Sequence, residues 1–147
     1  MGVCVIRLDG GGFEHVCDGA EPAWTLDGRG ALFVRQGRVI RRNLDTGKEI
    51  ALADGPEAPL ENPSCVQGRG VVCVGGAGSS IVLIPSESGA QPRALCRDEE
   101  LGEPRASPDG RLLAYRRGAH IHLMDLDTGQ TRQLTSVSYT HLRAHET

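Results

Sequence analysis

The sequence predicts an all-β protein, built as a partial β-propeller of four-stranded antiparallel blades. The first observation is a short pattern that occurs three times, beginning at Pro22, Pro63 and Pro104, so that successive copies are 41 residues apart. The second is composition, because 20 glycines and 8 prolines in 147 residues suit short strands joined by tight turns. The third is a series of short apolar runs separated by turn signals. A repeat of this length indicates stacked supersecondary units, and four short strands per unit indicate propeller blades.

The third copy shows the expected strands and turns most clearly. Ser107-Pro108-Asp109-Gly110 predicts a tight turn, because proline presets φ, aspartate caps its own backbone and glycine accepts a positive φ. The segment His120–Met124 alternates in polarity, as a strand with two different faces does. The predicted strands are therefore 105–107, 112–115, 120–124 and 132–135, with further turns at 117–118 and 127–129.

The same positions can be assigned in the rest of the chain. The predicted second strands are 31–34 and 71–74, the third strands 39–40 and 81–84, and the fourth strands 50–52 and 93–96. Segments 3–8 and 13–17 supply a third and a fourth strand ahead of the first full copy. We therefore expect about three and a half blades: a half blade of two outer strands over 1–20, and whole blades over 21–61, 62–102 and 103–135.

The second strands of the three copies are uninterrupted apolar runs, which indicates that both of their faces are covered by neighbouring blades. A β-sandwich also uses short strands, but it has no reason to repeat every 41 residues. A two-layer α/β fold is excluded, because no segment combines helical spacing with caps at both ends.

The motifs of the third copy resemble those of a known repeat family. Ser107-Pro108-Asp109-Gly110, a Met124-Asp125 step into a glycine turn and Arg132-Gln133-Leu134-Thr135 together resemble the TolB-type propeller repeat, also called PD40 or WD40-like. The first copy keeps Asp27-Gly28 but has Leu26 in place of the motif proline, and the second has Gln67-Gly68 instead of Pro-Asp-Gly.

This resemblance implies a propeller fold but leaves two functions open. Blades of this type occur in non-enzymatic scaffolds that bind a protein or small ligand at a propeller face, and this is the function we expect. The alternative is the N-terminal regulatory propeller of a prolyl-oligopeptidase-type serine hydrolase whose catalytic domain is missing. Oligogalacturonate lyases also contain such blades, and the resemblance is compatible with a periplasmic location. Fold alone does not separate these functions.

The last eleven residues depart abruptly from the repeat. Val137–Thr147 resembles the translation of a transposase-type sequencing adapter at every position. We therefore treat 136–147 as a non-native tail, leave His141 and His145 out of any ligand set, and expect the native protein to continue beyond the visible repeats.

Composition and charge exclude some classes of function. The net charge is −3 and no basic stripe occurs, so nucleic acid is not an expected partner. No apolar run reaches the roughly 18–20 residues of a membrane helix, and the polar N-terminus does not have the pattern of a signal peptide. The five cysteines, at 4, 17, 65, 73 and 96, contain no Cys-x-x-Cys pair, so we expect reduced thiols that pack as small apolar groups.

No residue is predicted to be catalytic, to bind a cofactor or to ligate a metal. His120 and His122 share one strand face but lack an identifiable third ligand. The glycine-rich segments 10–12 and 75–80 are expected to be hairpin turns, and Ser79 and Ser80 have no positioned base. Recurrence at equivalent positions favours a turn-capping role for four aspartates: Asp27, Asp45, Asp109 and Asp127.

The connections between blades are acidic. Segments 54–61 and 97–102 carry most of this charge, and in a propeller such connections gather on one face. They are expected to be solvated loops, with an acidic partner-binding rim as the alternative.

Overall fold

The computed structural model describes residues 2–6, 9, 11–87 and 89–135, and in this part of the chain the regular structure is β-strand with one short 3₁₀ segment, Gly55–Glu57. Strands β1 (Gly2–Ile6) and β2 (Phe13–Asp18) pair alone and are called the half blade. Three four-stranded sheets follow. Blade 1 is β3 (Ala20–Trp24), β4 (Gly30–Arg35), β5 (Arg38–Asn43) and β6 (Glu49–Ala51); blade 2 is β7 (Leu60–Val66), β8 (Gly70–Gly75), β9 (Ser80–Pro85) and β10 (Arg93–Arg97); blade 3 is β11 (Leu101–Ala106), β12 (Leu112–Arg117), β13 (His120–Asp125) and β14 (Thr131–Gln133).

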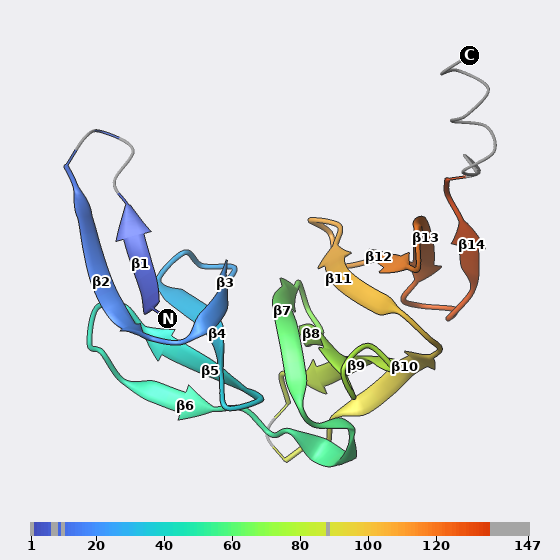
Figure 1. Ribbon diagram of the computed structural model, residues 1–147, viewed down its shortest axis with the longest axis horizontal. Coiled ribbons are helices and arrows are strands. Elements are labelled where there is room, and N and C mark those ends of the chain that lie inside the picture. The colour runs from blue at the N-terminus through green and yellow to red at the C-terminus, as the bar shows by residue number, and fades with distance from the viewer. Residues whose placement is uncertain (1, 7–8, 10, 88, 136–147) are drawn as a thin grey trace.

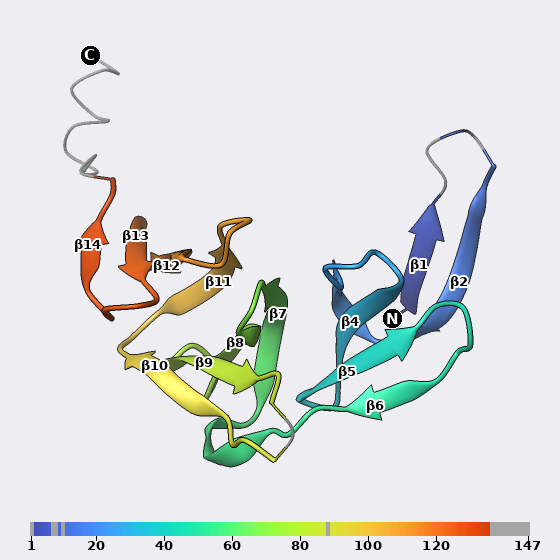
Figure 2. The same cartoon turned by 180° about the vertical axis from the view of Figure 1, so that it is seen from behind.

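Each blade is an antiparallel meander in which sequential strands are hydrogen-bonded neighbours. The blades follow one another along an open arc, with the half blade at one end and blade 3 at the other (Figures 1 and 2). The first strand of each blade, β3, β7 and β11, lies on the concave side of this arc (Figure 1). The prediction of an all-β partial propeller with four-stranded antiparallel blades is confirmed.

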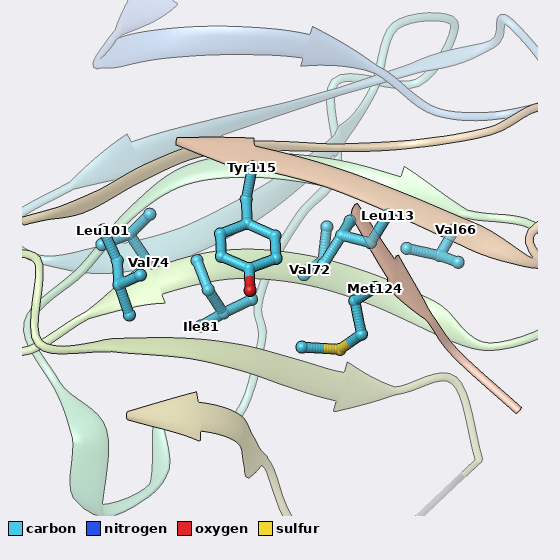
Figure 3. Packing of buried hydrophobic residues seen from close by; sticks show 8 residues of the cluster. All are labelled: Val66, Val72, Val74, Ile81, Leu101, Leu113, Tyr115 and Met124. Carbon is cyan, nitrogen blue, oxygen red and sulfur yellow. The ribbon is translucent and has the colours of Figure 1, made fainter. Parts of the chain in front are cut away.

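The hydrophobic core lies between the blades. Eight buried side chains pack between blades 2 and 3, including Val72, Leu113 and Met124 (Figure 3). A second cluster, with Leu32 and Val82, joins blades 1 and 2, and a smaller one around Phe33 joins the half blade to blade 1. The apolar second strands of blades 1 and 2 are covered on both faces as predicted, because successive side chains of a strand point to opposite blades. In blade 3 the second strand, β12, is covered on one face, and Leu112 on the other face is 42% exposed. In β8 every residue from Val71 to Gly75 is buried.

The first strand of each blade contains a β-bulge that sequence reasoning did not foresee. Glu21, Asn62 and Glu103 have φ values of 56°, 53° and 51°, each just before the repeated proline, and the strand register shifts there. The prediction started the first strand of blade 3 at Arg105, after the proline, whereas β11 begins at Leu101. That prediction was wrong because a bulge leaves residues outside the hydrogen-bonded ladder, and a proline without an N–H fits such a position.

Candidate functional site

The hairpins that join first to second and third to fourth strands lie at the same end of each blade, which we call the turn face. Asp27 and Asp109 occupy the first of these hairpins in blades 1 and 3. The Asp27 carboxylate accepts hydrogen bonds from the Thr25 hydroxyl at 2.7 Å and the Arg29 N–H at 2.9 Å. Asp109 accepts from the Ser107 hydroxyl at 2.7 Å and the Arg111 N–H at 3.0 Å. The predicted turn-capping role of these two aspartates is therefore confirmed.

The same hydrogen bonds make these two turns sensitive to acid. The hydroxyl groups of Thr25 and Ser107, followed by the backbone donors, hold the pKa of Asp27 and Asp109 below the usual value. A carboxylate whose pKa is lower in the folded chain than in the unfolded chain stabilises the fold at pH values above its pKa in the unfolded chain. This contribution is lost as the pH falls through the folded pKa. At neutral pH both carboxylates are ionised and accept the hydrogen bonds of their own turns.

The turn between third and fourth strands is capped by other residues than predicted. The side chain of Asn43 accepts from the N–H groups of residues 45 and 46 at 2.9 and 3.1 Å. Asp125 accepts in the same way from residues 127 and 128 at 2.8 and 3.1 Å. The capping role assigned to Asp45 and Asp127 is therefore wrong, because an Asx turn is closed by the side chain at its first position.

Asp127 is instead part of a contact between blades. The Arg69 guanidinium donates to the Asp127 carboxylate, to the Gly110 carbonyl at 2.8 Å and to the Leu126 carbonyl at 3.4 Å. Arg69 belongs to blade 2, and its three acceptors belong to blade 3. One guanidinium thus closes the turn-face side of the space between these blades, and we call this contact the Arg69 clasp.

The corresponding space between blades 1 and 2 is open. A cleft of about 620 Å³ lies there, lined from blade 1 by residues that include Arg41, Lys48 and Ile50, and from blade 2 by residues that include Cys65 and Ile84. We call it the interblade cleft. Its volume falls within the range of roughly 300–1,000 Å³ typical of small-molecule sites. It is the best candidate for a binding site in the described part of the chain.

The two histidines singled out in the sequence have local partners. The ring of His122 stacks on Tyr115, its cross-strand neighbour, with ring centroids 5.6 Å apart. The Nδ1 atom of His120 lies 3.4 Å from the Thr135 hydroxyl. Among the described residues no group of three or more His, Cys, Asp or Glu side chains is placed to hold a metal ion.

The glycine-rich segment from Gly75 to Ser80 is the hairpin between β8 and β9, as predicted. In this four-residue loop Gly76 and Ala77 have left-handed φ values of 57° and 58°, and the Gly75 carbonyl accepts from the N–H groups of Gly78 and Ser79 at 3.2 and 3.1 Å. The Ser80 hydroxyl is buried and donates to Glu57 at 3.2 Å, so it packs as a structural group. Of the other glycine-rich segment, Gly11 and Gly12 are described, and the Gly11 N–H donates to Asp9 at 2.9 Å.

One arrangement of catalytic residue types was missed by the sequence analysis. In the half blade the Cys4 sulfur lies 3.9 Å from His15 Nδ1, and His15 Nε2 lies 3.8 Å from the Asp18 carboxylate. An activated nucleophile needs its base within roughly 2.6–3.2 Å and a site for the substrate. All three residues are exposed and none lines the interblade cleft, so the arrangement does not constitute an active site.

Three carboxylates of the connections between blades are paired with arginines. Glu57 forms an ion pair with Arg97, Asp98 pairs with Arg117 at 2.9 Å, and Asp54 lies 3.7 Å from Arg38. These carboxylates are matched by arginines of the adjacent strands. Glu61, Glu99 and Glu100 of the same connections form no ion pair among the described residues, so this pairing reduces the acidic charge without removing it, and the acidic rim stays an alternative.

The cysteines differ in burial, which predicts an order of alkylation. Burial raises the pKa of the Cys73 thiol to about 12, whereas Cys4 is exposed. At pH 8 only about one Cys73 in ten thousand would be thiolate, the reactive form. We expect iodoacetamide to modify Cys4 first and Cys73 last, measured by peptide mass spectrometry. In denaturant all five should react alike, and equal native rates for Cys4 and Cys73 would contradict the burial described above.

Comparison with known proteins gives matches of fold. No family model and no curated protein matches the sequence. Among solved structures, a TolB from Agrobacterium tumefaciens matches with a TM-score of 0.72 and 24% identity, over 84% of this chain and 49% of that one. TolB from Acinetobacter baumannii matches with a TM-score of 0.75 and 19% identity, over 93% and 38% of the two chains. The chain has a TolB-like β-propeller fold.

The TolB-like fold confirms the resemblance that the repeat motifs indicated. A chain of the mitotic checkpoint complex has the same kind of fold, with a TM-score of 0.72, 16% identity and coverage of 92% of this chain and 44% of that one. The present chain spans less than half the length of each of these three structures. In the part that the structure describes, no helix is long and apolar enough to cross a membrane. The adapter-like segment 137–147 lies outside the described residues.

Proposed function

We propose that this TolB-like propeller is a non-enzymatic binding scaffold that holds a ligand or a partner segment at its turn face. The observation that carries the proposal is the interblade cleft, which is lined from two blades. A site of this kind needs the blades to be fixed relative to each other. The buried cluster between blades 1 and 2, with Leu32 and Val82 fully buried, provides that rigidity.

The lining of the cleft favours binding over catalysis. Its residues include a thiol, Cys65, whose pKa is raised by burial, and no histidine. Asp27 is the carboxylate of the lining, and it is occupied by the hydrogen bonds of its own turn. The cleft therefore offers shape, apolar surface and positive charge, without a nucleophile paired to a base. A propeller of this fold also occurs in a protein assembly, the mitotic checkpoint complex. The fold by itself does not imply catalysis.

The proposal is tested by measuring binding and turnover on the same sample. The full chain is screened by thermal shift against a panel of organic acids, short peptides, sugars and nucleotides. We expect at least one compound to raise the melting temperature in a concentration-dependent way, and to be recovered unchanged after hours of incubation. Conversion of the compound in proportion to protein concentration would overturn the non-enzymatic scaffold.

A matched pair of variants locates the binding. Ile50 lines the cleft and is 43% exposed, and Leu134 of blade 3 is 52% exposed and lies outside the lining. Ile50→Ala should weaken the compound's effect on the melting temperature, and Leu134→Ala should leave it unchanged. Equal effects of both variants would place the binding elsewhere.

A further inference from the structure

The Arg69 clasp has no counterpart between blades 1 and 2 among the described residues, and the interblade cleft lies there. Arg29 follows the turn glycine of blade 1 as Arg69 follows that of blade 2, and Glu87 holds the place in blade 2 that Asp127 holds in blade 3. No ion pair joins Arg29 to Glu87 among the described residues, and Glu87 is not part of the cleft lining. The space that a guanidinium fills between blades 2 and 3 is therefore left open between blades 1 and 2.

The open cleft carries an excess of positive charge. Its charged lining consists of one carboxylate and five cations: Asp27, Arg29, Arg41, Arg42, Lys48 and Arg69. Arg42 is paired with Glu49 at 2.8 Å, and Arg69 is used in its clasp. Asp27 accepts hydrogen bonds within its turn. Among the described residues, Arg29, Arg41 and Lys48 form no ion pair, so their charge is available to a ligand.

Two of these cations belong to the face of blade 1 that looks into the cleft. Arg41 is the cross-strand partner of both Leu32 and Ile50, and directly opposed residues share a sheet face. Lys48 lies two residues before Ile50, immediately ahead of the outer strand β6, and its carbonyl accepts from the Asn43 N–H at 2.9 Å. Arg41 acts electrostatically on the Cys65 thiol across the cleft, opposing the larger effect of burial on that pKa. Arg41 and Lys48 therefore border the same space.

The uncharged lining combines apolar side chains with four polar ones, Thr25, Asn43, Thr46 and Ser86. Leu32 and Ile84 are buried in the cluster below, and Ile50 is exposed along the cleft wall. An apolar surface beside unpaired cations is complementary to a molecule that has an acidic group at one end and a hydrocarbon or aromatic body at the other. A small inorganic anion would leave the apolar wall uncovered, and a neutral apolar molecule would leave the cations unmatched.

We propose that the interblade cleft binds a small organic anion, with its carboxylate or phosphate between Arg41 and Lys48 and its apolar body against Ile50 and Leu52. This inference rests on the proposed scaffold function and specifies its ligand class. Each solvent-exposed ion pair contributes modestly to binding, so the apolar contacts provide the remaining affinity. Selectivity for the anion follows from the two cations acting together.

The test uses octanoate as the probe and octanamide as its neutral analogue, with binding to the full chain measured by isothermal titration calorimetry. The double variant Arg41→Gln/Lys48→Gln removes both cations. The control Arg93→Gln/Arg132→Gln makes the same change of charge at residues outside the lining, neither of which forms an ion pair in the described part. Unchanged melting temperatures of both variants show that they fold.

We expect octanoate to bind the wild-type chain and the control alike, and the cleft variant about tenfold more weakly, which corresponds to ~1.4 kcal/mol. Octanamide should bind the wild-type chain more weakly than octanoate, and raising the salt concentration should reduce only octanoate binding. Equal octanoate affinity in the cleft variant and the control would overturn the proposal.

A second readout is independent of calorimetry. Cys65 lines the cleft and Cys96 is about as exposed but packs between blades 2 and 3. Octanoate should slow alkylation of Cys65 and leave that of Cys96 unchanged. If octanoate and octanamide protect Cys65 equally, the anion inference fails while the scaffold function stands. If neither protects it and the wider panel also fails to bind, both are wrong.

Discussion

We expect the Gly110→Ala substitution to lower the free energy of unfolding by about 3 kcal/mol, measured by urea denaturation. Gly110 has a φ of 75°, and a Cβ atom there would lie 2.3 Å from the Gln67 carbonyl oxygen of blade 2. The left-handed conformation costs an alanine about 1–2 kcal/mol, and the overpacking adds about 1–3 kcal/mol. Because the obstructing atom belongs to the backbone, it cannot move aside without separating the two blades.

Gly28 provides the matched control. It occupies the same Asp-Gly-Arg turn in blade 1 and has a φ of 71°, but a Cβ atom there would meet nothing within 4 Å. Gly28→Ala should therefore cost only the conformational part, about 1–2 kcal/mol. Equal losses in the two variants would mean that blades 2 and 3 do not meet at this turn as described.

The second large effect is expected for Leu113→Ala, which should lower the free energy of unfolding by about 2–5 kcal/mol. Leu113 is fully buried in the cluster between blades 2 and 3 (Figure 3). Removing its side chain leaves a cavity that rigid strands on both sides cannot close. Urea denaturation followed by circular dichroism measures the loss.

Its neighbour Leu112 is the control, because the next residue of a strand points to the opposite face. Leu112 is 42% exposed, and Leu112→Ala should cost less than about 1 kcal/mol. A loss for Leu112→Ala as large as that for Leu113→Ala would contradict the assignment of the inner and outer faces of blade 3.

The blades could be predicted from the sequence because the residues that define them act locally. Pro22, Pro63 and Pro104 mark the period, and Asp109-Gly110 specifies its own turn through its own hydrogen bonds. Local rules were less decisive where two residues competed for one role. The turn at 125–129 contains two aspartates, and only the geometry shows that Asp125 caps the backbone while Asp127 reaches Arg69.

The cleft could not be predicted, because it lies where a contact between blades is missing. The Arg69 clasp joins blades 2 and 3, and no such contact joins blades 1 and 2 among the described residues. Arg29 and Arg69 follow a turn glycine in the same way, and nothing in the local sequence separates the arginine that is clasped from the one that is not. One usable signal was present: Arg41 and Lys48 lie close to the hairpin that joins the third and fourth strands of blade 1, and the residue opposite Arg41 is the apolar Ile50. The bulges were missed for a similar reason, since a proline was taken to precede a strand when it lies within one.

The bulge before each repeated proline also bears on how the chain avoids unwanted association. The strands β3, β7 and β11 are the edge strands on the concave side of the arc (Figure 1). A regular exposed edge is a template on which a strand of another molecule can add. Here each such edge is interrupted by a left-handed residue and by a proline that has no N–H to donate. The repeated motif therefore places a barrier to strand addition on every blade, so this protection is copied along the chain with the blade itself.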